Sequence, residues 1–172
     1  EGFTFEIVSK NTDETMDVSL SPYQNVMNVA RKKGEAVASL FPNDVVLSTD
    51  TIVCLDGKIY GKPKDRKDAY NTLATFSGMT HEVVSGVSII SKKLSMTMYV
   101  KSYVTFKKLT KEMIDDYLKT DEPYDKAGSY AIQGEGRSLI EGYSGSLDNI
   151  IGLPIEYIKD MLRVMLNEVE NR

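Results

Sequence analysis

The stretch from Val45 to Pro63 contains a carboxylate, Asp50, and a lysine, Lys62, whose types and spacing suit chemistry at one site. A carboxylate can hold a divalent cation and can orient or deprotonate a water molecule, and a lysine supplies a compact positive charge. From residue type alone, a lysine at such a position is better explained as exposed to solvent. The same holds for Asp13-Glu14, which is better explained as a solvated loop pair than as a second carboxylate beside Asp50.

Two strands are predicted to position these groups. The apolar run Val45–Leu47 predicts a buried strand that ends on polar residues, and Ile52–Leu55 resumes an apolar strand. Asp56-Gly57 predicts a hairpin turn, because both residue types tolerate positive φ. Lys58–Tyr60 is then the returning strand, and Gly61–Pro63 closes it. Adjacent strands of a sheet hold reacting groups more accurately than loops do.

A second unusual stretch, Asp121–Gly136, contains one proline, three glycines, Lys126 and Gln133. Glycines allow a backbone to approach a ligand closely, and the lysine and glutamine offer a cation and a two-way amide. The alternative is a turn-rich loop around a short strand, Ser129–Ile132. Composition favours neither interpretation over the other.

Local signals predict the remaining elements. Helices are expected to begin near Ser21, Asp65, Thr110 and Leu153, where capping residues or proline precede apolar residues at helical spacing. Alternating or apolar segments predict strands at Phe3–Val8, His81–Ile90, Leu94–Phe106 and Arg137–Tyr143, and Ser144–Gly152 is expected to be a loop. Strands interspersed with helices, with one long hairpin through 91–93, indicate an α/β or α+β fold with a mixed sheet.

The composition limits the classes of function. A chain of 172 residues with net charge −4 fits one globular domain and provides no basic stripe for nucleic acid. No apolar stretch approaches the length of a membrane span, and no signal peptide is visible. Cys54 permits no internal disulfide and is expected to be buried and unreactive. His81, the one histidine, is expected to be a hydrogen-bonded structural residue and not a metal ligand.

Taken together, the motifs of this chain resemble those of the Maf nucleotide pyrophosphatases, also called septum-formation-inhibitor-like proteins. They occur in the order of that family and span nearly the whole chain. The matching residues are Asp13-Glu14, Ser48–Val53, Gly61-Lys62-Pro63, Ser77-Gly78, Thr80–Val83, Asp125–Gly134 and Asn149–Pro154.

The resemblance implies a single domain over residues 1–172, with an elongated mixed α/β sheet, flanking helices, and two lobes around a cleft. It implies hydrolysis of a nucleoside triphosphate to the monophosphate and pyrophosphate, with Mg²⁺ or Mn²⁺. It also implies a cytoplasmic protein of a kind that often forms homodimers, while the composition argues against nucleic acid or a membrane as a partner. The family opens with a strand and a Ser-x-x-Arg phosphate loop, which are not expected within this chain.

Residue by residue, Asp50 matches the general base of the family, and Thr51 and Gln133 match the positions that set base preference. The expected roles of the others are metal binding by Asp50 with Glu14, and phosphate binding by Lys62 and Lys126. Magnesium uses only one or two protein carboxylates, so this pair is chemically sufficient.

The resemblance also indicates which base is read. The Asp-Thr pair and the Ile-Gln-Gly sequence look like the branch of the family that acts on dTTP and UTP. Gln133 can accept a hydrogen bond from N3–H and donate one to O4 of uracil or thymine. One alternative is the branch that prefers methylated GTP, against which Gln133 argues. Another is a nucleotide-binding regulator of septum formation without turnover.

Overall fold

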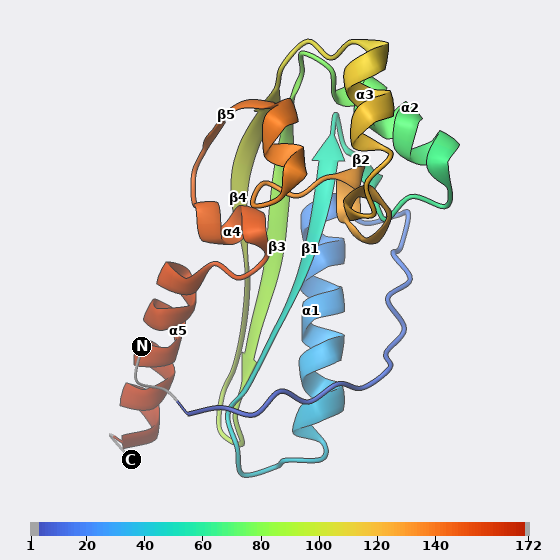
Figure 1. Cartoon of the computed structure of the whole chain (residues 1–172). Helices are drawn as coiled ribbons and strands as arrows, with labels where there is room; N and C mark the ends of the chain where they lie inside the picture. Colours follow the sequence, from blue (N-terminus) through green and yellow to red (C-terminus); the bar gives the residue numbers. More distant parts are fainter. Residues whose placement is uncertain (1–3, 171–172) are drawn as a thin grey trace.

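The structure is a computed structural model that describes the backbone of residues 4–170 and the side chains of residues 4–165. Its centre is a five-stranded sheet in the order β2-β1-β3-β4-β5, in which every described pairing is antiparallel (Figure 1). The strands are β1 (Val46–Leu55), β2 (Lys58–Tyr60), β3 (Thr80–Ile90), β4 (Ser95–Phe106) and β5 (Ile140–Ser144). The expected α/β fold with an elongated central sheet and flanking helices is confirmed, but the described strands form an antiparallel sheet and not the mixed one that was predicted.

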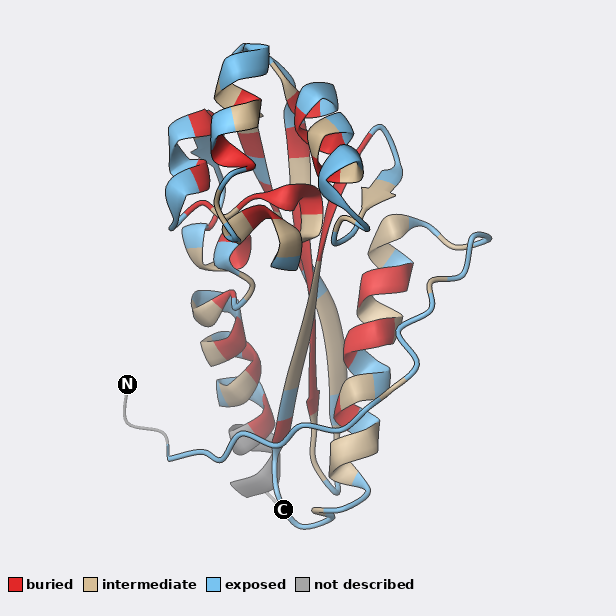
Figure 2. Cartoon of the chain, turned by 45° about the vertical axis from the view of Figure 1, so that its right-hand side comes forward, coloured by how far each residue is buried: buried red, intermediate tan, exposed pale blue. Residues whose placement is uncertain are grey.

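Helices lie against both faces and around one end of the sheet. The helices are α1 (Pro22–Ala38), α2 (Arg66–Phe76), α3 (Lys111–Tyr117), α4 (Leu147–Ile151) and α5 (Ile155–Glu170), with 3-10 turns at Glu122–Asp125, Ala127–Ser129 and Glu135–Leu139. Figures 1 and 2 show α1 and α5 on opposite sides of the lower half of the sheet, while α2, α3 and the 3-10 turns gather at its upper end. No helix among the described residues is both long and apolar enough to cross a membrane.

The buried side chains form one cluster at the upper end of the sheet and two clusters along its lower part. The upper core joins α2 and α3 to the sheet through residues such as Leu73, Phe76 and Phe106. In the lower region, α1 packs on one face around Val84, and α5 packs on the other around Val87. Neighbouring β-strand residues point to opposite faces, so one long strand, β3, supplies a core to each helix. Figure 2 shows these buried stretches along the strands and the inner helix faces.

The hairpin after β1 confirms the turn prediction, because Asp56 has φ 51° and Gly57 has φ 78°. The polar residues 48–51 do not interrupt the strand, however. They pair with β3 in unbroken register from Val46 opposite Ile90 to Cys54 opposite Glu82. Side-chain polarity does not affect the backbone ladder, so one ten-residue strand forms where the sequence indicated two apolar runs.

The predicted helix starts are confirmed where a side chain caps the backbone. Ser21 and Gln24 form the reciprocal capping box of α1, with Pro22 at its first position. Asp65 accepts from the Asp68 amide at the start of α2, and Thr110 caps α3 through its hydroxyl.

Four predictions of local structure were wrong or shifted. The segment predicted as strand Phe3–Val8 is extended without strand pairing over residues 4–8, and Phe5 is 77% and Ile7 89% exposed, while Phe3 lies outside the described residues. Ser129–Ile132 is not a strand, since Ser129 has φ 62° within a 3-10 turn. Strand β5 begins at Ile140, three residues after the predicted start, and the expected loop 144–152 contains helix α4. Alternation of polar and apolar residues produces a strand only where a neighbouring strand offers partners, and none of the described strands does so for residues 4–8.

Candidate active site

Three charged side chains from distant parts of the chain meet at the middle of β1. The Lys33 ammonium, on α1, lies 2.8 Å from Asp50 Oδ1 and 3.0 Å from Glu14 Oε1. Asp50 comes from β1, and Glu14 from the irregular segment before α1. The structure therefore brings Asp50 and Glu14 together, with one cation shared between their carboxylates.

This meeting depends on a glycine in the neighbouring strand. Gly86 is the residue opposite Asp50 in the β1–β3 register. A Cβ at Gly86 would overlap the main-chain carbonyl of Val26, so only glycine lets α1 lie this close to the sheet. Lys33 is seven residues after Val26, two helical turns further on the same face, and so it reaches Asp50.

The surroundings of Asp50 raise the pKa of its carboxyl, which makes the carboxylate a stronger base. Burial of the side chain, which is 13% exposed, raises the pKa of Asp50 above its ordinary value. The ammonium of Lys33 lowers it and the charge of Glu14 raises it, with a net increase. For Lys33, burial lowers the pKa, but the hydrogen bonds to Asp50 and Glu14 outweigh burial, and the pKa is raised. Lys33 therefore stays protonated, and Asp50 is a stronger base than an exposed aspartate.

Sequence reasoning missed Lys33. It lies on the same helix face as Val26, Val29, Ala30 and Val37, which the apolar spacing had assigned to the core. A single lysine within such an apolar face was the available signal, because a charge placed there requires partners.

Lys62 and Lys126 form a second cluster. Their ammonium groups lie 2.6 Å and 3.5 Å from the two carboxylate oxygens of Asp125. Lys62 lies two residues beyond the end of β2, so it is carried by a loop and not, as predicted, by a strand adjacent to Asp50. The Gly128 amide donates to the Gly61 carbonyl at 3.1 Å and joins the two loops. All three charged side chains are exposed, so these ion pairs can be exchanged for those of a ligand.

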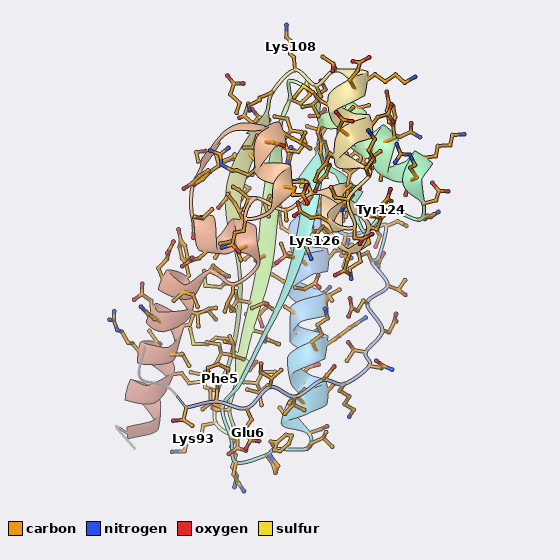
Figure 3. All side chains as sticks on the ribbon, viewed as in Figure 1. Phe5, Glu6, Lys93, Lys108, Tyr124 and Lys126 are labelled. Carbon is orange, nitrogen blue, oxygen red and sulfur yellow. The ribbon has the colours of Figure 1, made fainter. Side chains whose placement is uncertain are left out.

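The second cluster lies along the same edge of β1 as Asp50. Tyr60 pairs with Val53, and the antiparallel direction then carries the chain from Gly61 to Lys62 back towards the middle of β1. Gly128 packs closely against Val53 of β1. A Cβ atom added to Gly128 would lie 3.0 Å from the Val53 side chain. Figure 3 shows Lys126 beside β1.

The two residues expected to read the base lie apart from each other. Thr51 points to the opposite face of the sheet from Asp50, and its hydroxyl lies 2.8 Å from that of Ser85. Ser85 in turn donates to the Asn149 carbonyl at 3.2 Å. Gln133 is exposed in the turn after Ile132, and its side chain makes no hydrogen bond to the part of the chain that the structure describes. No hydrogen bond therefore joins the Gln133 side chain to Thr51 or Asp50.

A cavity of about 1030 Å³ adjoins the first cluster. Its walls are residues 4–10, the lower parts of α1 and β1, Glu14 and Lys33. Two of these residues, Phe5 and Glu6, are labelled near the lower end of the sheet in Figure 3. Asp50, Lys62 and Gln133 do not line the cavity. It opens beside residues 46–49 of β1, which pair on one edge with β3 and have no strand partner on the other among the described residues. Glu14 and Lys33 are therefore reached from a space of the size that small-molecule ligands occupy.

The donors at the first cluster fit a hard divalent cation. Among the side chains of residues 4–165, no group of three or more His, Cys, Asp or Glu is arranged to hold a metal. Asp50 and Glu14 nevertheless place two carboxylates near each other, since one oxygen of each lies within 3.0 Å of the Lys33 ammonium. In phosphate enzymes, Mg²⁺ is commonly bound by one or two protein carboxylates, and phosphate and water fill its other coordination positions.

The structural interpretations of Cys54 and His81 are confirmed. Cys54 is buried, its thiol donates to Glu82 at 3.4 Å, and burial raises its pKa to about 12, which makes it a poor nucleophile. His81 is 1% exposed, stacks on Phe76, and its Nε2 lies 2.8 Å from the Tyr130 hydroxyl.

His81 makes the fold sensitive to acid. Burial lowers its pKa from 6.5 to about 4. The unfolded chain binds this proton as pH falls below 6.5, and the native chain does so only near pH 4, so stability is lost as pH falls through this window. We expect His81→Phe to lack this loss. From pH 7 to pH 5, the unfolding free energy of the parent should fall by about 2 kcal/mol more than that of the variant, measured by urea denaturation. Equal slopes for the two proteins would contradict the assignment.

Comparison with known proteins places the chain in a family. A family model described as "Maf-like protein" matches residues 1–165. A dTTP/UTP pyrophosphatase of Bacillus pumilus is 43% identical over 154 residues, which are 90% of this chain and 82% of the relative. Those of Bacillus cytotoxicus and Bacillus mycoides are 45% and 46% identical over 151 residues, or 88% of this chain and 79% of each relative.

Proposed function

This chain belongs to the Maf family, and we propose that it hydrolyses nucleoside triphosphates, dTTP and UTP foremost, to the monophosphate and pyrophosphate. The relatives named dTTP/UTP pyrophosphatase support this activity. Within the structure, the observation that carries the proposal is the cluster in which Lys33 joins Asp50 and Glu14. It combines a half-buried base of raised pKa with a site for a cation, which are the two requirements for attack on a phosphate anhydride.

In the reaction, a water oxygen forms a bond to the α-phosphorus and the bond to the oxygen that bridges the α- and β-phosphates breaks. Asp50 accepts a proton from the attacking water, and the bridging oxygen leaves with pyrophosphate. Such transfers depend mainly on positioning and charge neutralisation. A divalent cation held by Asp50 and Glu14, Mg²⁺ or Mn²⁺, would supply further charge neutralisation and acidify the water. Lys33 keeps both carboxylates oriented towards the reacting phosphate.

Lys62 and Lys126 bind the phosphate oxygens in this proposal. Each is exposed and paired with Asp125, and an exposed ion pair contributes little to stability, so a triphosphate can replace the aspartate at small cost. The position of both lysines along the edge of β1 supports contact with the phosphates of a substrate whose α-phosphorus lies at Asp50.

Gln133 reads the base by donating to O4 and accepting from N3–H, a pattern shared by uracil and thymine. Thr51 contributes through its hydrogen bond to Ser85 and the Asn149 carbonyl beyond it, which stabilises β1 next to the reacting groups. A homodimer in the cytoplasm completes the proposal, and light scattering of the purified chain tests the dimer.

The decisive experiment is pyrophosphate release from a panel of dTTP, UTP, CTP, GTP and 7-methyl-GTP with Mg²⁺ or Mn²⁺. We expect dTTP and UTP to be hydrolysed fastest. Fastest turnover of the methylated GTP would move the chain to the other branch of the family. Tight nucleotide binding by calorimetry with no product would instead support a regulator without turnover.

Replacement of the base-reading amide should change the preference within that panel. Gln133→Glu loses the donor to O4, and the ratio of kcat/KM for UTP to that for CTP should fall about 10- to 100-fold, which corresponds to about 1–3 kcal/mol for an unpaired polar group. Glu135→Gln, an exposed neighbour in the same turn, is the matched control and should leave the ratio unchanged. An unaltered ratio in Gln133→Glu would remove this residue from base recognition.

A further inference from the structure

The turn that carries Gln133 is held by a carboxylate to which the motifs assigned no role. Glu122 Oε1 accepts hydrogen bonds from the Tyr117 hydroxyl and the Gly136 amide, both at 2.8 Å, and Oε2 accepts from the Glu135 amide at 2.9 Å. The two amides follow Gln133 by two and three residues. We infer that Glu122 is a positioning residue that sets where Gln133 meets the nucleotide base, an inference that rests on the proposed function of the site.

The backbone around this carboxylate is shaped to receive it. A Cβ at Gly134 would overlap Glu122 Oε2, so only glycine lets the carboxylate reach the amides beyond it. Gly136 is equally confined, since a Cβ there would lie 2.8 Å from the Ala131 carbonyl oxygen and 3.0 Å from the Tyr117 hydroxyl. The two glycines and the glutamate therefore form one unit, with Gln133 directly before it.

The charge of Glu122 is maintained by its donors. Burial raises the pKa of this carboxyl, but the Gly136 amide, the Tyr117 hydroxyl and the Glu135 amide outweigh burial, and the pKa is lowered. Tyr117 is 5% exposed, and burial together with the adjacent carboxylate raises its pKa, so it remains a donor. Hydrogen bonds to an ionised acceptor are stronger than neutral ones, which suits a contact that must hold a turn in place.

The other end of the same segment is held independently. The Tyr130 hydroxyl lies 2.8 Å from Nε2 of buried His81, and the Gly128 amide donates to Gly61. Gln133 lies between these contacts and those of Glu122, and its own side chain has no hydrogen bond to the described residues. The position of Gln133 therefore depends on how the main chain is held on either side of it. On the carboxyl-terminal side, the main chain is held by the hydrogen bonds from the Glu135 and Gly136 amides to Glu122.

The test is the base preference of Glu122→Gln. The substitution keeps size and one acceptor but places an amide donor against the Glu135 N–H. We expect KM for UTP to rise about tenfold and the UTP to CTP ratio of kcat/KM to fall about tenfold, with kcat changed less than threefold. Hydrolysis of ribose 5-triphosphate, which has no base to read, should be unaffected. Asp121→Asn, the neighbouring acid without a capping contact, is the control and should match the parent.

The outcomes separate this inference from the proposed function. If the parent hydrolyses UTP and Gln133→Glu changes base preference while Glu122→Gln does not, Glu122 has no positioning role and the proposed function stands. An equal loss on UTP and ribose 5-triphosphate indicates general damage to the fold and also overturns the inference. A parent that hydrolyses no nucleotide overturns both. Should Glu122→Gln not fold, Tyr117→Phe, which removes one of the three hydrogen bonds, should lower the ratio by a smaller factor.

Discussion

Asp50→Asn is expected to lower kcat for dTTP hydrolysis by about a thousandfold, within the range measured for loss of a general base. The amide keeps the shape of the side chain but cannot take a proton from water, and it is a weaker ligand for a divalent cation. It also removes one of the two carboxylates that contact Lys33. The measurement is pyrophosphate release at saturating dTTP and Mg²⁺, beside the parent.

Asp56→Asn is the matched control for this variant. It makes the same chemical change six residues further along, in the hairpin turn, where φ is 51° and asparagine is readily accommodated. We expect parental kcat from it. Circular dichroism should show both variants folded, and a folded Asp50→Asn as fast as its parent would exclude Asp50 from proton transfer.

Lys33→Met should produce the second largest loss, on the order of a hundredfold in kcat/KM, comparable to the removal of one electrostatic donor from an active site. The variant leaves two carboxylates facing each other without their shared cation. Because Lys33 lowers the pKa of Asp50 and Glu14 raises it, that pKa should rise further. The base then stays protonated to higher pH, so the acidic limb of the kcat/KM profile should move upward in pH.

The pH profile separates this role from a loss of stability. Lys33→Arg, which keeps the charge, should retain the parental acidic limb even where activity falls because of its different shape. Lys32→Met, an exposed neighbour on α1, should behave as the parent does. An acidic limb in Lys33→Met that overlays the parental one would show that this lysine does not influence the titration of Asp50.

Elements with local signals were predictable from the sequence. The capping box at Ser21, the Asp56-Gly57 turn and the alternation through Leu94–Phe106 each specify structure through residues near one another in the chain, and each prediction was confirmed. Phe3–Val8 has the same alternation as a true strand. The prediction was wrong over its described part because a strand also requires a neighbour, which local sequence cannot supply.

The sequence indicated which residues could form the candidate site, but it did not indicate how they are arranged in space. The chemical types at Asp50, Glu14, Lys62, Lys126 and Gln133 were evident, and their roles remain predictions. The sequence did not reveal that Lys33 joins Asp50 to Glu14, that Asp125 lies between Lys62 and Lys126, or that Thr51 points away from Asp50. Each of these depends on strand register or on how closely a helix approaches the sheet.

The sequence by itself therefore determined the capped helices, the hairpins, the family and the kinds of chemical group available. Only the tertiary structure decided which groups share a site, because a residue meets a distant partner through packing that no local pattern encodes. Gly86 illustrates the reason: its missing side chain allows α1 to lie against the sheet, and a lysine that the pattern assigned to an apolar helix face thereby reaches the carboxylate of Asp50.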